Sequence, residues 1–357
     1  MSLRPRWVLV TLDYPPAGGG ISRLLNALVA GSADAVEWRV LTTTPGNSAE
    51  GVRRVRPAHL LLALRDEMQW ARAAAGGRIV IGHPFLATPV VAAARLTGLP
   101  SSAIVYGREL VARGPHHRAL LAGLSRVERV LSISDATAQV VSRLGVRPSH
   151  VVVVHPALSG ASRRSPRTPR PQGRALRIVL VTRLAEHYKN LDLVHAVLLV
   201  LKRTATVERC VVIGDGPLRH SHMRAARDAG LAAVLHYPGR LSDDEMRSVM
   251  HDSDIGIFPS RTSSAEGGFE GFGLVIHELA ATGLPVLVGD TAAAREAVGS
   301  GWSLLLDPED VGMWAKTLHS LCLDPIRLDR MTTAAEEWAA RADPSVAIRQ
   351  MVAGLRG

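Results

Sequence analysis

Residues 270–278 read Glu-Gly-Phe-Gly-Leu-Val-Ile-His-Glu, between an apolar run at 255–259 and a helix-like segment at 273–282. A buried strand that leads through a glycine-rich turn into a helix is the repeating unit of a parallel α/β sheet. Glycine lets the backbone approach a ligand closely, and the first turn of a helix offers unpaired N–H groups to an anion. This stretch therefore predicts an α/β fold with a ligand site after the strand.

The same alternation of strand and helix extends in both directions. In the first half we expect strands at 6–12, 37–42, 78–82, 102–105, 129–133 and 150–155, with helices at 21–30 and 136–144. In the second half we expect strands at 175–182, 208–213, 234–237, 255–259 and 285–288, with helices at 191–202, 243–251 and 273–282. Short apolar runs bounded by glycine or proline are typical of buried parallel strands.

A segment rich in serine, arginine, proline and glycine separates the two alternating halves. Such a composition without apolar periodicity predicts a linker. We expect a first Rossmann-like domain at 1–160, the linker at 161–173 and a second Rossmann-like domain at 174–338. A carboxyl-terminal helix at about 342–355 is expected to complete the first domain. Two such domains would face each other across a cleft, with ligands outside the carboxyl ends of the strands.

Composition narrows the class of protein further. The chain has 357 residues and two cysteines, Cys210 and Cys322, in apolar surroundings far apart in the sequence. A disulfide framework or zinc site is not expected, and a reducing cytoplasm is the expected compartment. The sequence contains no apolar stretch long enough for a transmembrane helix, and its start lacks the features of a signal peptide.

The positive charge is concentrated in the first half of the chain. Residues 1–174 hold 23 arginines, no lysine and 9 acidic residues, a net charge of +14, whereas residues 175–357 carry a net charge of −4. This asymmetry favours an anionic acceptor or an anionic membrane surface as partner. We expect no nucleic-acid partner, because aromatic residues that could stack on bases do not interleave with the arginines.

Apolar residues also recur at helical intervals between His117 and Leu131, with arginines on the opposite side. We expect an ordinary amphipathic helix of the domain here. A helix lying on a membrane surface is the alternative.

Two groups of charged residues flank glycine-rich turns in the second half. Glu270 and Glu278 bracket the turn described first, and carboxylates accept hydrogen bonds from pairs of sugar or ribose hydroxyls. Arg183 and Lys189 lie after the expected strand at 175–182 and could neutralise a diphosphate. The ordinary alternatives are acids near a helix start and solvated loop cations.

Several motifs together resemble the family 4 (group 1) retaining glycosyltransferases of GT-B fold. The similarity rests on Arg183-Leu184, Lys189-Asn190, Gly214-Asp215-Gly216-Pro217 and Phe269–Leu274 with the two glutamates seven residues apart. It extends to Pro15–Gly20, Ser132–Thr137 and Val151–Leu158 in the first half. The motifs occur in the family's order and span nearly the whole chain.

The resemblance implies a role for each matching residue. Arg183 and Lys189 would hold the donor's diphosphate, Glu278 the nucleotide ribose and Glu270 a hydroxyl of the transferred sugar. The remaining implied donor contacts are Gly19, Gly20, Arg240, Leu241, Phe272, Gly273 and Leu274. The resemblance also implies retention of anomeric configuration by front-face attack, in which the leaving phosphate helps to deprotonate the acceptor. Neither a protein nucleophile nor a divalent metal is then implied, and no resident cofactor is expected.

The chain departs from the family pattern at two places. Where many relatives carry a histidine, this sequence has Tyr106-Gly107-Arg108-Glu109, so we name His83, Tyr106 and Glu109 as acceptor-side candidates. Ala293-Ala294 replaces a glycine pair before Glu296, which changes the expected local loop.

The resemblance predicts transfer of a sugar from a nucleotide-diphosphate sugar, with uridine diphosphate favoured over guanosine diphosphate, to an acceptor hydroxyl. The acceptor is expected to be a lipid-linked or cell-envelope glycan precursor, with the enzyme in the cytoplasm at the inner membrane face. The alternatives are the tailoring of a secondary metabolite, a non-catalytic nucleotide-sugar binder, and an anion-binding protein that uses its arginine-rich half.

Overall fold

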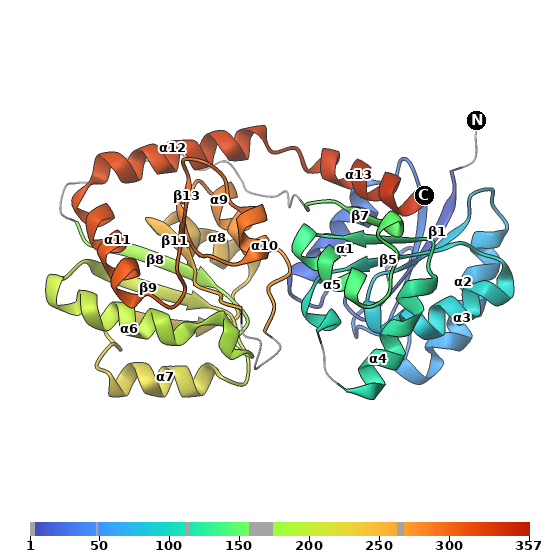
Figure 1. Cartoon of the computed structure of the whole chain (residues 1–357), viewed down its shortest axis with the longest axis horizontal. Coiled ribbons are helices and arrows are strands. Elements are labelled where there is room, and N and C mark those ends of the chain that lie inside the picture. The colour runs from blue at the N-terminus through green and yellow to red at the C-terminus, as the bar shows by residue number, and fades with distance from the viewer. Residues whose placement is uncertain (1–3, 48, 112–113, 157–173, 263–267) are drawn as a thin grey trace. The chain divides into compact units, whose positions relative to one another are not determined.

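The computed structural model describes residues 4–47, 49–111, 114–156, 174–262 and 268–357 (Figure 1). These residues form two compact units: Met1–Leu158 together with Asp343–Gly357, and Ser159–Ala342. The linker expected at 161–173 lies outside the described residues.

The first unit contains a seven-stranded parallel sheet in the order β3-β2-β1-β4-β5-β6-β7. Its strands are β1 (Arg6–Thr11), β2 (Glu37–Thr42), β3 (Val52–Arg54), β4 (Arg78–Ile81), β5 (Ser101–Val105), β6 (Arg129–Ser132) and β7 (Val151–Val153). Its helices are α1 (Gly20–Gly31), α2 (Leu60–Arg72), α3 (Ala87–Thr97), α4 (Pro115–Leu121), α5 (Asp135–Arg143) and α13 (Pro344–Arg356). The central strands β4 and β5 are buried along their whole length. This is expected for a parallel sheet that helices cover on both faces.

The carboxyl-terminal helix α13 packs on α1 and on β6 of the first unit. Its last turn is fixed by side chains from the sheet: Ser102 Oγ donates to the Leu355 carbonyl (2.8 Å), and Arg78 Nη2 donates to the Arg356 carbonyl (2.6 Å). A second Arg78 nitrogen donates to Ser102 Oγ (2.8 Å). Carbonyls at a helix end have no partner within the helix, so these donors satisfy groups that would otherwise be unpaired.

The second unit contains a six-stranded parallel sheet in the order β10-β9-β8-β11-β12-β13. Its strands are β8 (Leu176–Val181), β9 (Val207–Ile213), β10 (Leu235–Gly239), β11 (Ile255–Phe258), β12 (Val286–Gly289) and β13 (Ser303–Leu306). Its helices are α6 (Leu191–Leu201), α7 (Arg219–Asp228), α8 (Asp243–His251), α9 (Leu274–Ala281), α10 (Ala292–Ala297), α11 (Val311–Leu323) and α12 (Pro325–Arg341). Helices α6 and α11 pack together over one apolar cluster of the sheet, which includes the buried Trp314.

Two parallel, helix-covered sheets confirm the expected α/β class with two Rossmann-like units. One helix prediction is wrong. Instead of a single helix over 117–131, the chain forms the short helix α4, then a 3-10 turn at Ala122–Arg126, and then strand β6. Thr88 Oγ1 donates to the carbonyls of Ala119 and Leu120 and accepts from Gly123 N (2.9 Å), which ends α4. Gly123 also lies so close to Ala87 that a Cβ would be 2.4 Å from its carbonyl carbon.

Among the described residues, no helix has both the length and the apolar character needed to cross a bilayer.

Replacing Arg78 with methionine should loosen α13, because the change leaves the Arg356 carbonyl and the Ser102 hydroxyl without their buried donor. We expect a loss of about 1–3 kcal/mol in the free energy of unfolding of the first unit. Faster amide hydrogen exchange in residues 344–356 would report the effect locally. The exposed Arg95 of α3 provides the control: Arg95→Met should leave exchange unchanged, and equal exchange in both variants would contradict the assignment.

Candidate functional site

The candidate site lies where the second sheet reverses its strand order. The chain runs from β8 outward to β9 and β10, and then returns to the other side of β8 to form β11. The loops that follow β8 and β11 therefore leave the same sheet edge side by side and run to opposite faces. In open parallel sheets, this topological switch point is where ligands bind.

Lys189 and Glu270, which follow β8 and β11, form an ion pair at this point. Lys189 Nζ donates to Glu270 Oε2 at 2.5 Å, although 81 residues separate them. Each side chain is only 13% exposed. Burial lowers the pKa of Lys189, but Glu270, together with Tyr188 and Glu186, outweighs this effect, so the pKa is raised and the ammonium stays charged.

The surroundings of Lys189 are aromatic. Its Nζ lies 4.8 Å from the ring centre of Tyr188 and 5.6 Å from that of Phe258, both within cation–π range. The segment leading to Glu270 lies directly on Tyr188, since a Cβ at Gly268 would be 2.5 Å from Tyr188 Cβ. The ammonium group is thus enclosed by two rings and one carboxylate.

Asn190 fixes the loop that carries Lys189. It adopts the left-handed conformation (φ 59°) immediately before α6, which asparagine tolerates better than most residues. Its buried amide donates to the carbonyls of Pro259 (3.1 Å) and Pro308 (2.8 Å). These bonds connect the loop after β8 to the end of β11, so the chain positions Lys189 before any ligand arrives.

Arg183, the other expected diphosphate ligand, forms a separate pair on the same loop. Its guanidinium contacts both carboxylate oxygens of Glu186, at 2.8 Å and 3.4 Å. The Arg183 side chain is 58% exposed, whereas that of Glu186 is only 8% exposed. The exposed side of the guanidinium can therefore receive an anion while Glu186 stays in place.

The glycines of the segment Gly214–Gly216 allow the next loop to pack against this one. Gly214 (φ 135°) lies so close to Thr182 that a Cβ would be 1.8 Å from the Thr182 carbonyl oxygen. Backbone bonds also join the two loops, from Leu184 N to the Asp215 carbonyl (3.0 Å) and from Leu218 N to the Leu184 carbonyl (2.8 Å). Gly214 and Gly216 thus have a structural role here, because they let the loops after β8 and β9 pack together.

The glycine-rich turn before α9 brings further predicted residues to this edge. Gly273 is left-handed (φ 88°) and directly precedes α9, Phe272 is buried, and Leu274 begins the helix. Glu278 lies on α9 and is half-buried.

Arg240 and Leu241 follow β10, at the outer edge of the sheet. Leu241, but not Arg240, lines a hollow of about 800 Å³ beside β9 and β10, whose lining also includes His236 and Tyr237. Lys189 and Glu270 are not among the lining residues of this hollow. We place the candidate site at the ion pair, because its charges can act on a ligand whereas the hollow offers mainly apolar surface.

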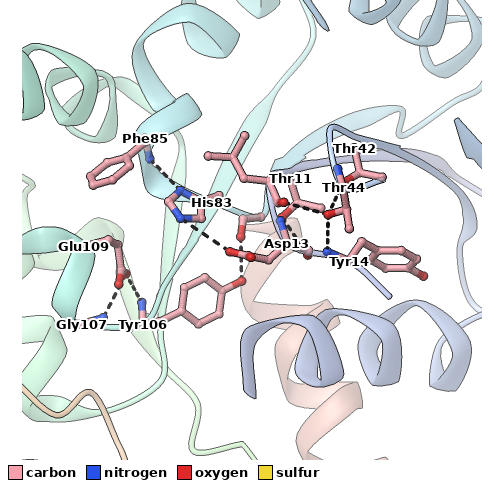
Figure 2. Close-up of polar contacts among 12 residues, drawn as sticks. Thr11, Asp13, Tyr14, Thr42, Thr44, His83, Phe85, Tyr106, Gly107 and Glu109 are labelled. Carbon is pink, nitrogen blue, oxygen red and sulfur yellow. Dashed lines mark hydrogen bonds and ion pairs between the residues drawn. The ribbon is translucent and has the colours of Figure 1, made fainter. Parts of the chain in front are cut away.

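The first sheet has a second cluster at its own switch point, between β1 and β4 (Figure 2). His83 Nε2 lies 3.8 Å from Asp13 Oδ2. His83 Nδ1 accepts from Phe85 N (3.3 Å), which places the proton of the neutral ring on Nε2, facing Asp13. Burial lowers the pKa of His83, against the opposing effect of Asp13, so the neutral form is favoured.

Of the other acceptor-side candidates, Glu109 bonds to its own loop and Tyr106 bonds to the loop after β4 (Figure 2). Glu109 Oε1 accepts from the backbone N–H groups of Tyr106 (2.6 Å) and Gly107 (3.0 Å), and burial raises the pKa of Glu109. Tyr106 OH donates to the Gly82 carbonyl at 2.9 Å. Asp13 was not among the candidates, although a carboxylate two residues after a buried strand could have indicated it.

Gly19 and Gly20 also belong to the first unit. Gly19 (φ 119°) immediately precedes α1, and a Cβ there would meet no atom within 4 Å. The start of α1 is therefore an open helix amino terminus of the kind that attracts anions.

Comparison with known proteins identifies the class of the second unit. Residues 164–338 match the model of glycosyl transferases group 1. The chain is 29% identical over 162 residues to a GDP-mannose-dependent α-(1-6)-phosphatidylinositol monomannoside mannosyltransferase of Mycobacterium tuberculosis, covering 45% of this chain and 42% of that relative. It is 26% identical to a glycogen synthase of the same species, over 93% of this chain and 89% of the relative. The chain thus spans less than half of the length of the mannosyltransferase it matches.

The fold also matches solved structures. The structure of Anabaena HepE in complex with UDP-glucose superposes with a TM-score of 0.76 over 98% of both chains, at 15% identity. At this identity the likeness shows the fold, which is that of the two-unit GT-B proteins. The match over residues 164–338 places the carboxyl-terminal unit among the group 1 glycosyltransferases, the family that its motifs resemble.

Gly214→Ala should disrupt the site, because the new Cβ would collide with the Thr182 carbonyl and the residue would be strained at its positive φ. We expect a loss of about 2 kcal/mol or more in the free energy of unfolding of the second unit. Gly230→Ala is the matched control, since Gly230 also has a positive φ (66°) but faces only the flexible end of Lys202. Urea denaturation should show the larger loss for Gly214→Ala, and a loss no greater than that of the control would refute the close packing.

Proposed function

We propose that the protein is a retaining, metal-independent glycosyltransferase that transfers a sugar from a nucleotide-diphosphate sugar to an acceptor hydroxyl. The observation that carries this proposal is the buried Lys189–Glu270 pair at the switch point of the second sheet. A cation there can receive a diphosphate, and a carboxylate beside it can receive a sugar hydroxyl. The family of the second unit supports the reaction class.

In this proposal the two cations act on the leaving group. The bond between the anomeric carbon and the phosphate oxygen breaks, and negative charge develops on the diphosphate. Lys189 and Arg183 neutralise that charge, which lowers the barrier. The acceptor oxygen forms the new bond on the same face of the sugar, and its proton passes to the departing phosphate. Retention follows from this front-face course without a protein nucleophile.

The remaining predicted residues would hold the donor. Glu278 would bind the ribose, Glu270 a sugar hydroxyl, and the amides of Phe272, Gly273 and Leu274 the sugar and phosphates. Gly19 and Gly20 would contact the phosphates, and Arg240 and Leu241 the base. No resident cofactor is needed, because the nucleotide sugar is itself a co-substrate. Uridine diphosphate is the carrier we favour; guanosine diphosphate is the alternative, in view of the named GDP-mannose-dependent relative.

The first unit would bind the acceptor near His83, with Tyr106 and Glu109 shaping the loop. Its positive charge favours an anionic or lipid-linked acceptor, a cell-envelope glycan precursor, with the enzyme in the cytoplasm and in peripheral contact with an anionic membrane. Tailoring of a secondary metabolite remains the alternative reaction. A protein that binds the nucleotide sugar without releasing nucleotide in the presence of acceptors would be a non-catalytic binder instead.

Nucleotide diphosphates and their sugars should raise the thermal unfolding midpoint of the wild type. At a ligand concentration of about 100 times Kd, the expected stabilisation is about 2.7 kcal/mol. Arg183→Ala and Glu278→Ala should each reduce the shift, whereas Arg203→Ala, which removes an exposed cation from the same unit, should preserve it. Absence of any nucleotide-dependent shift in the wild type would refute the donor site.

Transfer itself is tested with a labelled donor and a panel of lipid-linked acceptors. Lys189→Ala should lower kcat/KM by about 100-fold or more, since it removes a charge that stabilises the leaving diphosphate. NMR of the product should show the donor's anomeric configuration. A product of inverted configuration would overturn the proposed course of the reaction while leaving the donor site intact.

A further inference from the structure

The two partners that the proposed function assigns to different parts of the donor are bonded to each other in the structure. Lys189, assigned to the diphosphate, lies 2.5 Å from Glu270, assigned to the sugar. A diphosphate oxygen and Glu270 therefore compete for the same ammonium group. The ion pair is buried, since each of the two side chains is only 13% exposed.

Burial limits how this pair can come apart. Separating a buried ion pair without replacing either partner leaves an uncompensated charge, which is strongly unfavourable. The rings of Tyr188 and Phe258 attract the Lys189 ammonium but cannot replace a negative charge. Glu186 also acts on Lys189 electrostatically, but it is paired with Arg183. An anion that takes the place of Glu270 removes most of the penalty, and Glu270 then needs hydrogen-bond donors of its own.

A nucleotide sugar provides both replacements at once. Its diphosphate offers the anion for Lys189, and its sugar hydroxyls offer donors for Glu270. A nucleotide diphosphate without the sugar provides only the first, so Glu270 would be left buried and without its former partner. The same ion pair therefore discriminates between the nucleotide sugar and the nucleotide diphosphate that remains after transfer.

We propose that Lys189 exchanges Glu270 for the donor's diphosphate, and that Glu270 pairs with Lys189 again once the sugar has been transferred. This exchange rests on the proposed function. The exchange makes Glu270 a specificity-determining residue: it weakens the binding of nucleotide diphosphate and so promotes product release. The exchange predicts that the negative charge of Glu270 limits the affinity for the nucleotide diphosphate. Removing that charge should therefore raise the affinity.

The neighbouring Arg183–Glu186 pair differs in its cation. Arg183 is 58% exposed and can be solvated by water, whereas Glu186 is only 8% exposed. An anion can therefore approach Arg183 from its exposed side while Glu186 stays in place, whereas at Lys189 it must take the place of Glu270.

Isothermal titration of the full chain with pyrophosphate, UDP, GDP and UDP-glucose tests this exchange. Glu270→Gln keeps the shape and a hydrogen-bond acceptor but removes the competing charge. We expect it to bind pyrophosphate and the favoured nucleotide diphosphate about tenfold more tightly than the wild type. The affinity ratio of UDP-glucose to UDP should fall in this variant.

The matched control is Glu208→Gln, which removes one acidic charge from the start of β9, where Glu208 pairs with Arg177. It should leave all affinities unchanged, which would exclude a general effect of net charge. Unchanged or weaker nucleotide diphosphate binding by Glu270→Gln, with normal binding by the wild type, would overturn the exchange alone. Absence of binding by the wild type to every ligand would overturn the proposed function as well.

The wild type offers a test that does not depend on the folding of a variant. It should bind its donor sugar nucleotide more tightly than the corresponding nucleotide diphosphate, because only the donor supplies partners for Glu270. Tighter binding of the nucleotide diphosphate would overturn the exchange.

Discussion

The ion pair between Lys189 and Glu270 depends on the topology of the second sheet. Two neighbouring parallel strands, β8 and β11, continue into loops that lead to opposite faces, and the space between these loops is where the two charges meet. The first sheet repeats the arrangement, since Asp13 follows β1 and His83 follows the neighbouring β4. Each unit thus places one acid and one basic group at its switch point.

Enclosure gives the pair of the second unit its chemical importance. A lysine in water would meet a diphosphate as a solvated point charge, and competing water would weaken the contact. Lys189 is held by the Asn190 turn, between two aromatic rings, with Glu270 as its counter-charge. The close packing of Gly214 on Thr182 supports this loop from the adjacent strand, so its geometry does not await the ligand.

Much of the fold could be predicted because apolar runs and caps are local signals. The helix α8 occurs where expected, at 243–251, and begins with a capping box between Ser242 and Glu245. The short strand β3 was not predicted, since two of its three residues are arginines, and α7 was missed because its sequence is mostly polar. The helix expected over 117–131 ends early because Thr88, from a distant segment, bonds its last carbonyls.

The sequence indicated which residues form the site, but not which of them bond to each other. The spacing of the motifs indicated Lys189 and Glu270 separately, yet only the strand order shows that they neutralise each other. Asp13 follows a buried strand by two residues, but its position opposite His83 follows only from β1 lying beside β4. Glu109 was named from its place in the family motif, whereas its bonds to the loop backbone depend on the local turn.

A crystal structure of the protein with its nucleotide-diphosphate sugar would show which partner Lys189 binds when the donor is present. We expect diphosphate oxygens within salt-bridge distance, about 4 Å, of Lys189 Nζ, with Glu270 turned toward the sugar hydroxyls. A bound nucleotide sugar whose diphosphate lies elsewhere, with the Lys189–Glu270 contact still intact, would contradict this expectation.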